Sequence, residues 1–90
     1  MHAVVVRVTI GDFEAAQPVL RERIVPAAKG APGFVAGYWT RSEDGNNGLS
    51  MLVFESEEQA RAAAEMISAA PMPETVTQDS IEVREVVASA

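Results

Sequence analysis

The chain has 90 residues, of which 48% are hydrophobic, and a formal net charge of −6 at pH 7. This length and composition indicate one globular domain over residues 1–90 and exclude an intrinsically disordered chain. Its seven Lys and Arg residues do not cluster, so the sequence offers no grouped cations for nucleic acid or for an anionic membrane surface.

Membrane insertion and secretion are not expected. No apolar stretch approaches the roughly 20 residues that span a bilayer, and the start at Met1–Val4 lacks the basic region of a signal peptide. The chain has no cysteine, which excludes a disulfide framework, a thiol nucleophile and a thiolate metal site. We therefore expect a cytoplasmic protein with no metal and no cofactor.

The first predicted strand is Ala3–Ile10. Its even-numbered positions are all apolar and its odd-numbered positions are mixed, a pattern typical of a central strand that is covered on both faces. Gly11 breaks the strand, and Asp12 is suited to cap a following helix.

A helix containing two prolines is predicted next. Apolar residues recur at helical spacing from Phe13 to Ala27. Pro18 and Pro26 each remove a backbone donor, so we expect a kink or the true start at Pro18 and a kink or the end at Pro26. Lys29–Gly30 resembles a helix C-terminus.

A hairpin follows, with strands at Phe34–Arg41 and Leu49–Glu55. The connection contains residues 45–48, Gly-Asn-Asn-Gly, which we expect to supply the positive-φ positions of the turn. The two runs are too close for a crossover connection, so they should pair antiparallel.

The second helix carries the clearest local signal. Ser56 and Gln59 form a capping box, in which Ser56 caps the helix and the Gln59 side chain reaches back to the Ser56 amide. Met66 and Ile67 are the larger apolar anchors of an alanine-rich stretch. The helix should end at 70–73.

The chain then continues as a loop over 74–79 and closes with a strand at Ile81–Val87, one side of which should face solvent as at a sheet edge. The complete order is β-α-β-β-α-β, the ferredoxin-like arrangement of an α+β fold with a four-stranded antiparallel sheet. Its helices cover one face of the sheet, so the other face needs a cover, and we predict a homodimer.

Two segments resemble the antibiotic-biosynthesis-monooxygenase-like (ABM) group of the dimeric α+β barrel proteins. They are 31–38, Ala-Pro-Gly-Phe-Val-Ala-Gly-Tyr, and 53–60, Val-Phe-Glu-Ser-Glu-Glu-Gln-Ala. The resemblance in element order covers nearly the whole chain. It implies a homodimer whose sheets face each other in a dimeric α/β barrel, with an apolar pocket between sheet and helices in each subunit.

The resemblance also implies a range of activities. Some ABM relatives are cofactor-free monooxygenases acting on polycyclic phenols or quinols, and others degrade haem. The haem-degrading members use a helix-borne histidine as the iron ligand. Here the single histidine is His2, outside both predicted helices, where an exposed terminal side chain is the simpler interpretation.

Three side chains are candidates for ligand contact. Tyr38 and Trp39 are adjacent on a strand and should point to opposite faces, one towards any pocket and one towards a partner. Trp39 could stack on a flat ligand and Tyr38 could hydrogen-bond a phenolate or ketone oxygen. Arg7 could stabilise an enolate or peroxide anion. Packing is the simpler explanation of both aromatics. For Arg7 the simpler explanation is an ion pair with Glu82 or Glu85 on the last strand.

Two hypotheses about function stay open. In the first, the protein binds an aromatic or enolisable small molecule between its sheet and helices. If catalytic, it would be a cofactor-independent monooxygenase with Tyr38, Trp39 and Arg7 as its first site residues. In the second, it is a non-catalytic dimeric structural or regulatory module of the same fold.

Overall fold

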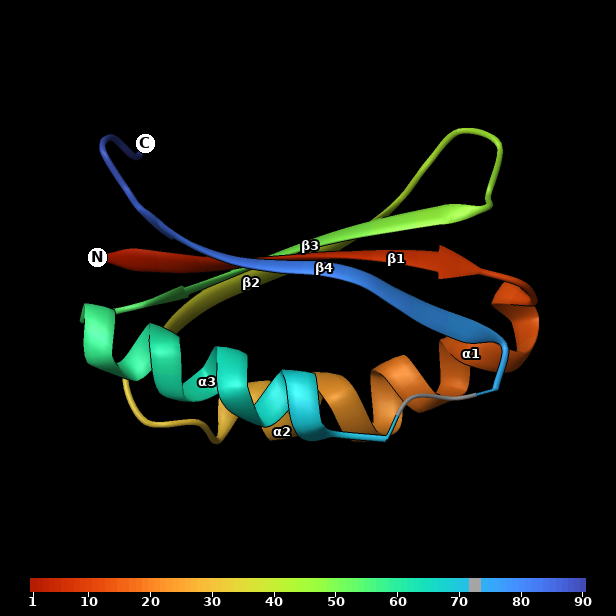
Figure 1. Cartoon of the computed structure of the whole chain (residues 1–90), viewed down its shortest axis with the longest axis horizontal. Helices are drawn as coiled ribbons and strands as arrows, with labels where there is room; N and C mark the ends of the chain where they lie inside the picture. Colours follow the sequence, from red (N-terminus) through yellow and green to blue (C-terminus); the bar gives the residue numbers. More distant parts are fainter. Residues whose placement is uncertain (72–73) are drawn as a thin grey trace.

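A computed structural model describes residues 1–71 and 74–90. In chain order its elements are β1 (His2–Ile10), α1 (Phe13–Val19), the π-helical segment η1 (Leu20–Ile24), α2 (Val25–Lys29), β2 (Phe34–Arg41), β3 (Asn47–Phe54), α3 (Glu57–Ala69) and β4 (Val76–Glu85). The strands form one antiparallel sheet in the order β2-β3-β1-β4, and the helices all lie on one side of it (Figure 1). The predicted α+β, ferredoxin-like order is confirmed.

The core lies between the sheet and α3. The apolar even-numbered residues of β1 face the helices, as their alternation predicts. The small side chains that α3 presents allow its backbone to lie close to the strands. The buried cluster consists of Val4, Val6, Leu52, Phe54, Ala60 and Ala63.

The opposite side of the sheet, which we call the open face, carries no helix of the described residues (Figure 1). Cross-strand pairing places on it Ala3, Val5, Arg7 and Thr9 of β1, Ala36, Tyr38 and Thr40 of β2, Leu49, Met51 and Val53 of β3, and Ser80, Glu82 and Arg84 of β4. The β2–β3 hairpin and the C-terminal segment both rise on this side of the sheet (Figure 1). Within one chain, therefore, β1 is covered by helices on one face rather than on both.

The helical segment formed by α1, η1 and α2 contains both prolines. The side chain of Asp12 caps α1, accepting a hydrogen bond from the Ala15 amide at 3.2 Å. Pro18 lies inside α1. In η1 the backbone follows the π-helical pattern, in which an N–H bonds to the carbonyl five residues earlier. Pro26 occupies the first turn of α2, where the absence of a backbone N–H costs little. The prediction that Pro26 could end the helix is therefore wrong, whereas the end at Lys29 is confirmed.

The predicted bounds of β2 are confirmed, but the turn that follows is simpler than expected. Of residues 45–48, only Gly45 has a positive φ, 81°, and β3 already begins at Asn47. The carboxylate of Asp44 closes the turn, because its Oδ1 accepts hydrogen bonds from the Ser42 hydroxyl at 2.6 Å and from the Asn46 amide at 2.9 Å.

Only half of the capping box at α3 is formed. The Ser56 hydroxyl accepts a hydrogen bond from the Gln59 amide at 3.2 Å, as predicted. The Gln59 side chain does not reach back. Its Oε1 is buried with no hydrogen-bond partner among the described residues, and the side-chain amide lies against Gly33.

The two predicted apolar anchors of α3 differ in their burial. Ile67 packs against the core cluster, as expected. Met66 is 68% exposed, so its predicted anchoring role is wrong. At 100° per residue, Met66 lies about 120° around the helix from the sheet-facing Ala60.

The predicted loop over 74–79 is confirmed at residues 74 and 75, which form a turn, and is wrong from Val76 onward. β4 begins at Val76, which pairs with Ile10, and its run of polar side chains concealed the strand in the sequence. The strand ends at Glu85, two residues earlier than predicted. Of the expected helix end at 70–73, Met72 and Pro73 lie outside the described residues. Along 1–71 and 74–90, no helix is long and apolar enough to cross a membrane.

Replacement of Gly33 tests the close approach of the segment before β2 to α3. Gly33 has φ 77°, so Gly33→Ala should lower the free energy of unfolding by about 1–2 kcal/mol through backbone strain. The new Cβ would also overlap the Gln59 side chain, which adds to this loss. Urea unfolding measures the effect.

Gly45→Ala is the matched control. It has a similar φ of 81°, and no heavy atom lies within 4 Å of the added Cβ, so it should show the backbone strain alone. Adding Gln59→Ala to Gly33→Ala should remove the difference between the two positions. A smaller loss at Gly33 than at Gly45 would contradict the packing of Gln59 on Gly33.

Candidate functional site

Strand β2 separates the two aromatic candidates. Tyr38 pairs with Met51 on the open face and is 68% exposed. Trp39 pairs with Ser50 and packs, partly buried, against the helix-side core. Its ring lies over Gly37, where an added Cβ would be 2.9 Å from the indole Cη2. The prediction that the two side chains point to opposite faces is confirmed.

Arg7 projects from the middle of β1 onto the open face, between Leu49 of β3 and Ser80 of β4. The predicted ion pair with Glu82 or Glu85 is wrong, because Glu82 binds Arg84 on its own strand, with an Nη2–Oε2 distance of 2.6 Å. In the part of the chain that the structure describes, the Arg7 guanidinium has neither an ion-pair nor a hydrogen-bond partner.

The three predicted site residues therefore do not converge within one chain. Arg7 and Tyr38 share the open face, but they stand two strands apart in adjacent rows of the sheet, a Cα separation of roughly 12 Å from standard sheet spacings. Trp39 lies on the helix side. The sheet itself separates the indole from the guanidinium.

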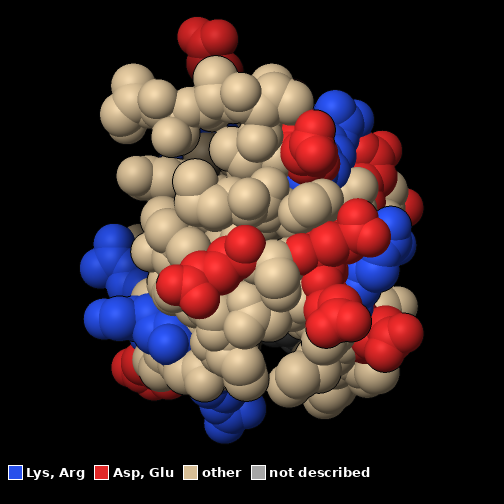
Figure 2. Space-filling view, turned by 90° about the vertical axis from the view of Figure 1, so that its left-hand side faces the viewer, with Lys and Arg blue, Asp and Glu red and all other residues tan. Residues whose placement is uncertain are grey.

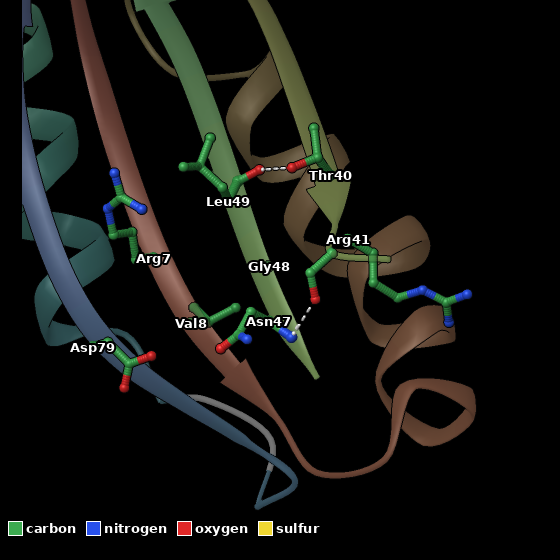
Figure 3. A pocket seen from close by; sticks show the side chains of 9 residues that line it. Arg7, Val8, Thr40, Arg41, Asn47, Gly48, Leu49 and Asp79 are labelled. Atoms are coloured by element: carbon green, nitrogen blue, oxygen red, sulfur yellow. Dashed lines mark hydrogen bonds between the residues drawn. The ribbon is translucent and has the colours of Figure 1, made fainter. Parts of the chain in front are cut away.

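A hollow of about 400 Å³, which we call the sheet hollow, opens at the hairpin end of the open face (Figure 3). The Arg41 side chain points away from it (Figure 3), and its Cζ lies 3.9 Å from the centre of the Phe13 ring in α1. The residues that line the sheet hollow are Arg7, Val8, Thr40, Arg41, Ser42, Asn47, Gly48, Leu49 and Asp79.

Asp79 reaches the sheet hollow through a β-bulge in β4. Arg7 pairs with Ser80 and the next residue of β1, Val8, pairs with Gln78, so Asp79 is the extra residue between them. An extra residue changes the direction in which a side chain of an edge strand points.

Two hydrogen bonds show which face of the sheet Gln78 and Asp79 occupy at the bulge. Gln78 donates from Nε2 to the Ile67 carbonyl at 3.2 Å on the helix side. Asp79 Oδ2 accepts from the Thr9 hydroxyl at 2.7 Å, and Thr9 belongs to the open face. The sequence predicted a loop at Asp79, and no signal within 77–80 marks the bulge.

A second hollow, of about 170 Å³, lies between α3 and the segment before β2, and we call it the helix groove. It is mainly apolar, and the buried, unpartnered Oε1 of Gln59 belongs to one of its walls. Its lining residues are Ala31, Pro32, Glu58, Gln59, Ala62, Ala63 and Met66.

His2 joins the start of β1 to the start of α3. Its Nε2 lies 3.3 Å from Oε2 of Glu57, and its side chain is only 21% exposed, so the expected exposed terminal histidine is wrong. Acidic side chains predominate in the centre of this end of the molecule (Figure 2). Among the described residues, no group of three or more His, Cys, Asp or Glu side chains could hold a metal ion.

The pKa of the Asp44 carboxyl lies below its ordinary value. Hydrogen bonds from the Ser42 hydroxyl and then from the Asn46 amide stabilise its charged form. The carboxylate sits in the exposed β2–β3 turn, so its charge organises the hairpin.

No protein-family model and no curated protein matches this sequence. Among solved structures, the chain is similar to MhuD, a haem-degrader from Mycobacterium tuberculosis with two haems bound in its active site. The TM-score is 0.57 and the sequence identity 24%, and the likeness covers 97% of this chain and 98% of that chain. The comparison shows that the two share the ferredoxin-like fold.

Gly37→Ala tests the placement of Trp39. The new Cβ would lie 2.9 Å from Cη2 and 3.1 Å from Cζ3 of the indole, so the ring should move outward. Fluorescence of the chain's single tryptophan should shift to longer wavelength and become easier to quench with acrylamide.

Tyr38→Phe is the matched control, because this side chain leaves β2 on the opposite face. It should leave the tryptophan spectrum unchanged. Identical emission from the wild type and from Gly37→Ala would show that Trp39 does not pack across Gly37.

Proposed function

We propose that this protein is a homodimer that assembles through the open face of its sheet, and that this dimer is a non-catalytic structural or regulatory module of the ABM-like fold. The observation that carries the proposal is the exposure of large apolar side chains on that face. Tyr38 is 68% exposed and Met51 is 41% exposed, and they are cross-strand neighbours. A contiguous apolar patch of this kind marks an interaction surface.

The open face supplies most of the area that a stable interface needs. Four strands at about 4.8 Å spacing and about eight residues in length cover roughly 19 by 26 Å, or about 500 Å² in projection. Stable interfaces bury about 800 Å² of accessible surface per partner. The raised hairpin and C-terminal segment (Figure 1) would add contact area at both ends of the face.

The arrangement of the candidate residues supports the non-catalytic part. A ligand stacked on Trp39 would be separated from Arg7 and Tyr38 of the same chain by the sheet. The sheet hollow is lined by strand and hairpin residues, and the helix groove by α3 and the segment before β2. Neither is lined by sheet and helix residues together, as the pocket implied by the family resemblance would be. A single domain over 1–90 and a cytoplasmic location complete this proposal.

Met51→Asp tests assembly through the open face. A two-fold interface would bury two unpaired carboxylates, each costing at least about 1.4 kcal/mol. The dimer Kd should therefore rise at least about 100-fold, measured by analytical ultracentrifugation.

Met66→Asp is the matched control, because Met66 is exposed on α3, on the other side of the molecule. It should leave Kd unchanged, and circular dichroism checks the fold of both variants. A wild type that stays monomeric at 100-micromolar-scale concentrations, or equal effects of both variants, would refute the assembly.

A second candidate is the binding of a flat aromatic molecule, which the position of Trp39 favours. Its indole is partly buried on the helix side, where such a molecule could stack. The helix layer also contains η1, a kind of irregularity frequent at functional sites. The similar MhuD structure has two haems in its active site. If catalytic, this chain would be a cofactor-independent monooxygenase.

Titration of Trp39 fluorescence separates the two candidates. Haem, a polycyclic phenol and a quinol are added in turn, and the emission is corrected for the inner-filter effect. The non-catalytic proposal expects no saturable quenching. Saturable quenching by one compound, with the dimer intact, would replace it with the ligand-binding candidate and justify an oxygen-uptake assay.

A further inference from the structure

The sheet hollow contains charges that one copy of the chain does not satisfy. The Arg7 guanidinium has no ion-pair or hydrogen-bond partner within 1–71 and 74–90. Asp79 uses Oδ2 to accept the Thr9 hydroxyl, while its Oδ1 accepts no hydrogen bond from the described residues. A cation and a carboxylate with free bonding capacity therefore stand on neighbouring strands of one surface.

Burial of this surface would penalise Arg7 strongly. A guanidinium that loses its water without gaining an acceptor is among the costliest groups to place in an interface. Assembly through the open face therefore favours a register that places a carboxylate opposite Arg7. Glu82 is already held by Arg84 at 2.6 Å, which leaves Asp79 as the available carboxylate on the described open face.

We propose that Arg7 of each copy forms an ion pair with Asp79 of the other copy, so that the two sheet hollows close on each other. This inference rests on the proposed homodimer and specifies its register. In a two-fold interface every contact occurs twice with the roles exchanged. β1 and β4 are adjacent, about 5 Å apart, so an axis running between Arg7 and Asp79 brings each opposite its complement.

The geometry of Asp79 supports this role. The β-bulge directs its side chain to the open face, and the Thr9 hydroxyl holds one carboxylate oxygen in place. The carboxylate is thereby oriented before association. The Asp79 carboxylate also disfavours a small anion as the occupant of the sheet hollow. Its negative charge would repel an anion that Arg7 attracts.

The experiment reverses one charge at a time. Arg7→Asp and Asp79→Arg each place like charges opposite each other in their own homodimers, so each variant alone should raise Kd at least about 100-fold. An equimolar mixture should recover dimers within about tenfold of the wild-type Kd, because both ion pairs are attractive in the heterodimer. Native mass spectrometry distinguishes heterodimers from homodimers by mass.

The mixture separates pairing between copies from pairing within one chain. If Arg7 bound the Asp79 of its own chain, mixing would leave both repulsions in place, whereas the double variant Arg7→Asp/Asp79→Arg would recover. That result overturns the inference. Single variants that dimerise like the wild type would also overturn it while leaving the homodimer intact, and a monomeric wild type would instead refute the proposed function.

Two further measurements keep the test decisive. If a reversed variant fails to fold by circular dichroism, Arg7→Gln and Asp79→Asn replace it. Each should raise Kd, and mixing them should recover dimers in part, because the heterodimer has one wild-type Arg7–Asp79 pair and one neutral Gln–Asn pair. Succinate serves as the probe for a small-anion site, and saturable binding by the wild type but not by Arg7→Gln would assign the sheet hollow to a free carboxylate and overturn the pairing.

Discussion

The contact of Val4 and Val6 in β1 with Ala60 and Ala63 in α3 organises the whole molecule. Side chains alternate along a strand, so a β1 that buries its even-numbered residues under α3 must present its odd-numbered residues on the other face. Because β1 is a central strand, its two neighbours inherit the same division through their pairing. The helix-side core therefore determines which residues the open face carries, Arg7 among them.

In the proposed homodimer, two parts of the open face have different roles. The centre of this face is apolar, with Met51 and Tyr38 side by side, and burial of such side chains supplies most of the free energy of association. Its hairpin end carries Arg7 and Asp79, whose charges favour one register over others. In the proposed homodimer, affinity and register would thus arise from different rows of one sheet.

The sequence predicted the elements whose signals are local. The alternation of β1, the bounds of β2 and the cap by Ser56 follow from neighbouring residues alone. The errors come from tertiary contacts. β4 begins early because Ile10 pairs with Val76, and Gln59 leaves its capping position because it packs on Gly33. Strand periodicity placed Tyr38 and Trp39 on opposite faces, but only the assembled sheet shows which faces they are.

Trp39 lies on the helix side of the sheet, and Arg7 and Tyr38 lie on the open face. Ligand binding beside Trp39 and assembly on the open face would therefore differ in the native contacts that each must break. A flat ligand beside Trp39 on the helix side would have to enter a layer in which the indole already packs against core residues, so binding would exchange native contacts for ligand contacts. A second copy on the open face would displace mainly water, because no helix of the described residues covers that face (Figure 1). Assembly therefore gains apolar burial without breaking the contact between β1 and α3, and this difference favours the dimer as the functional form.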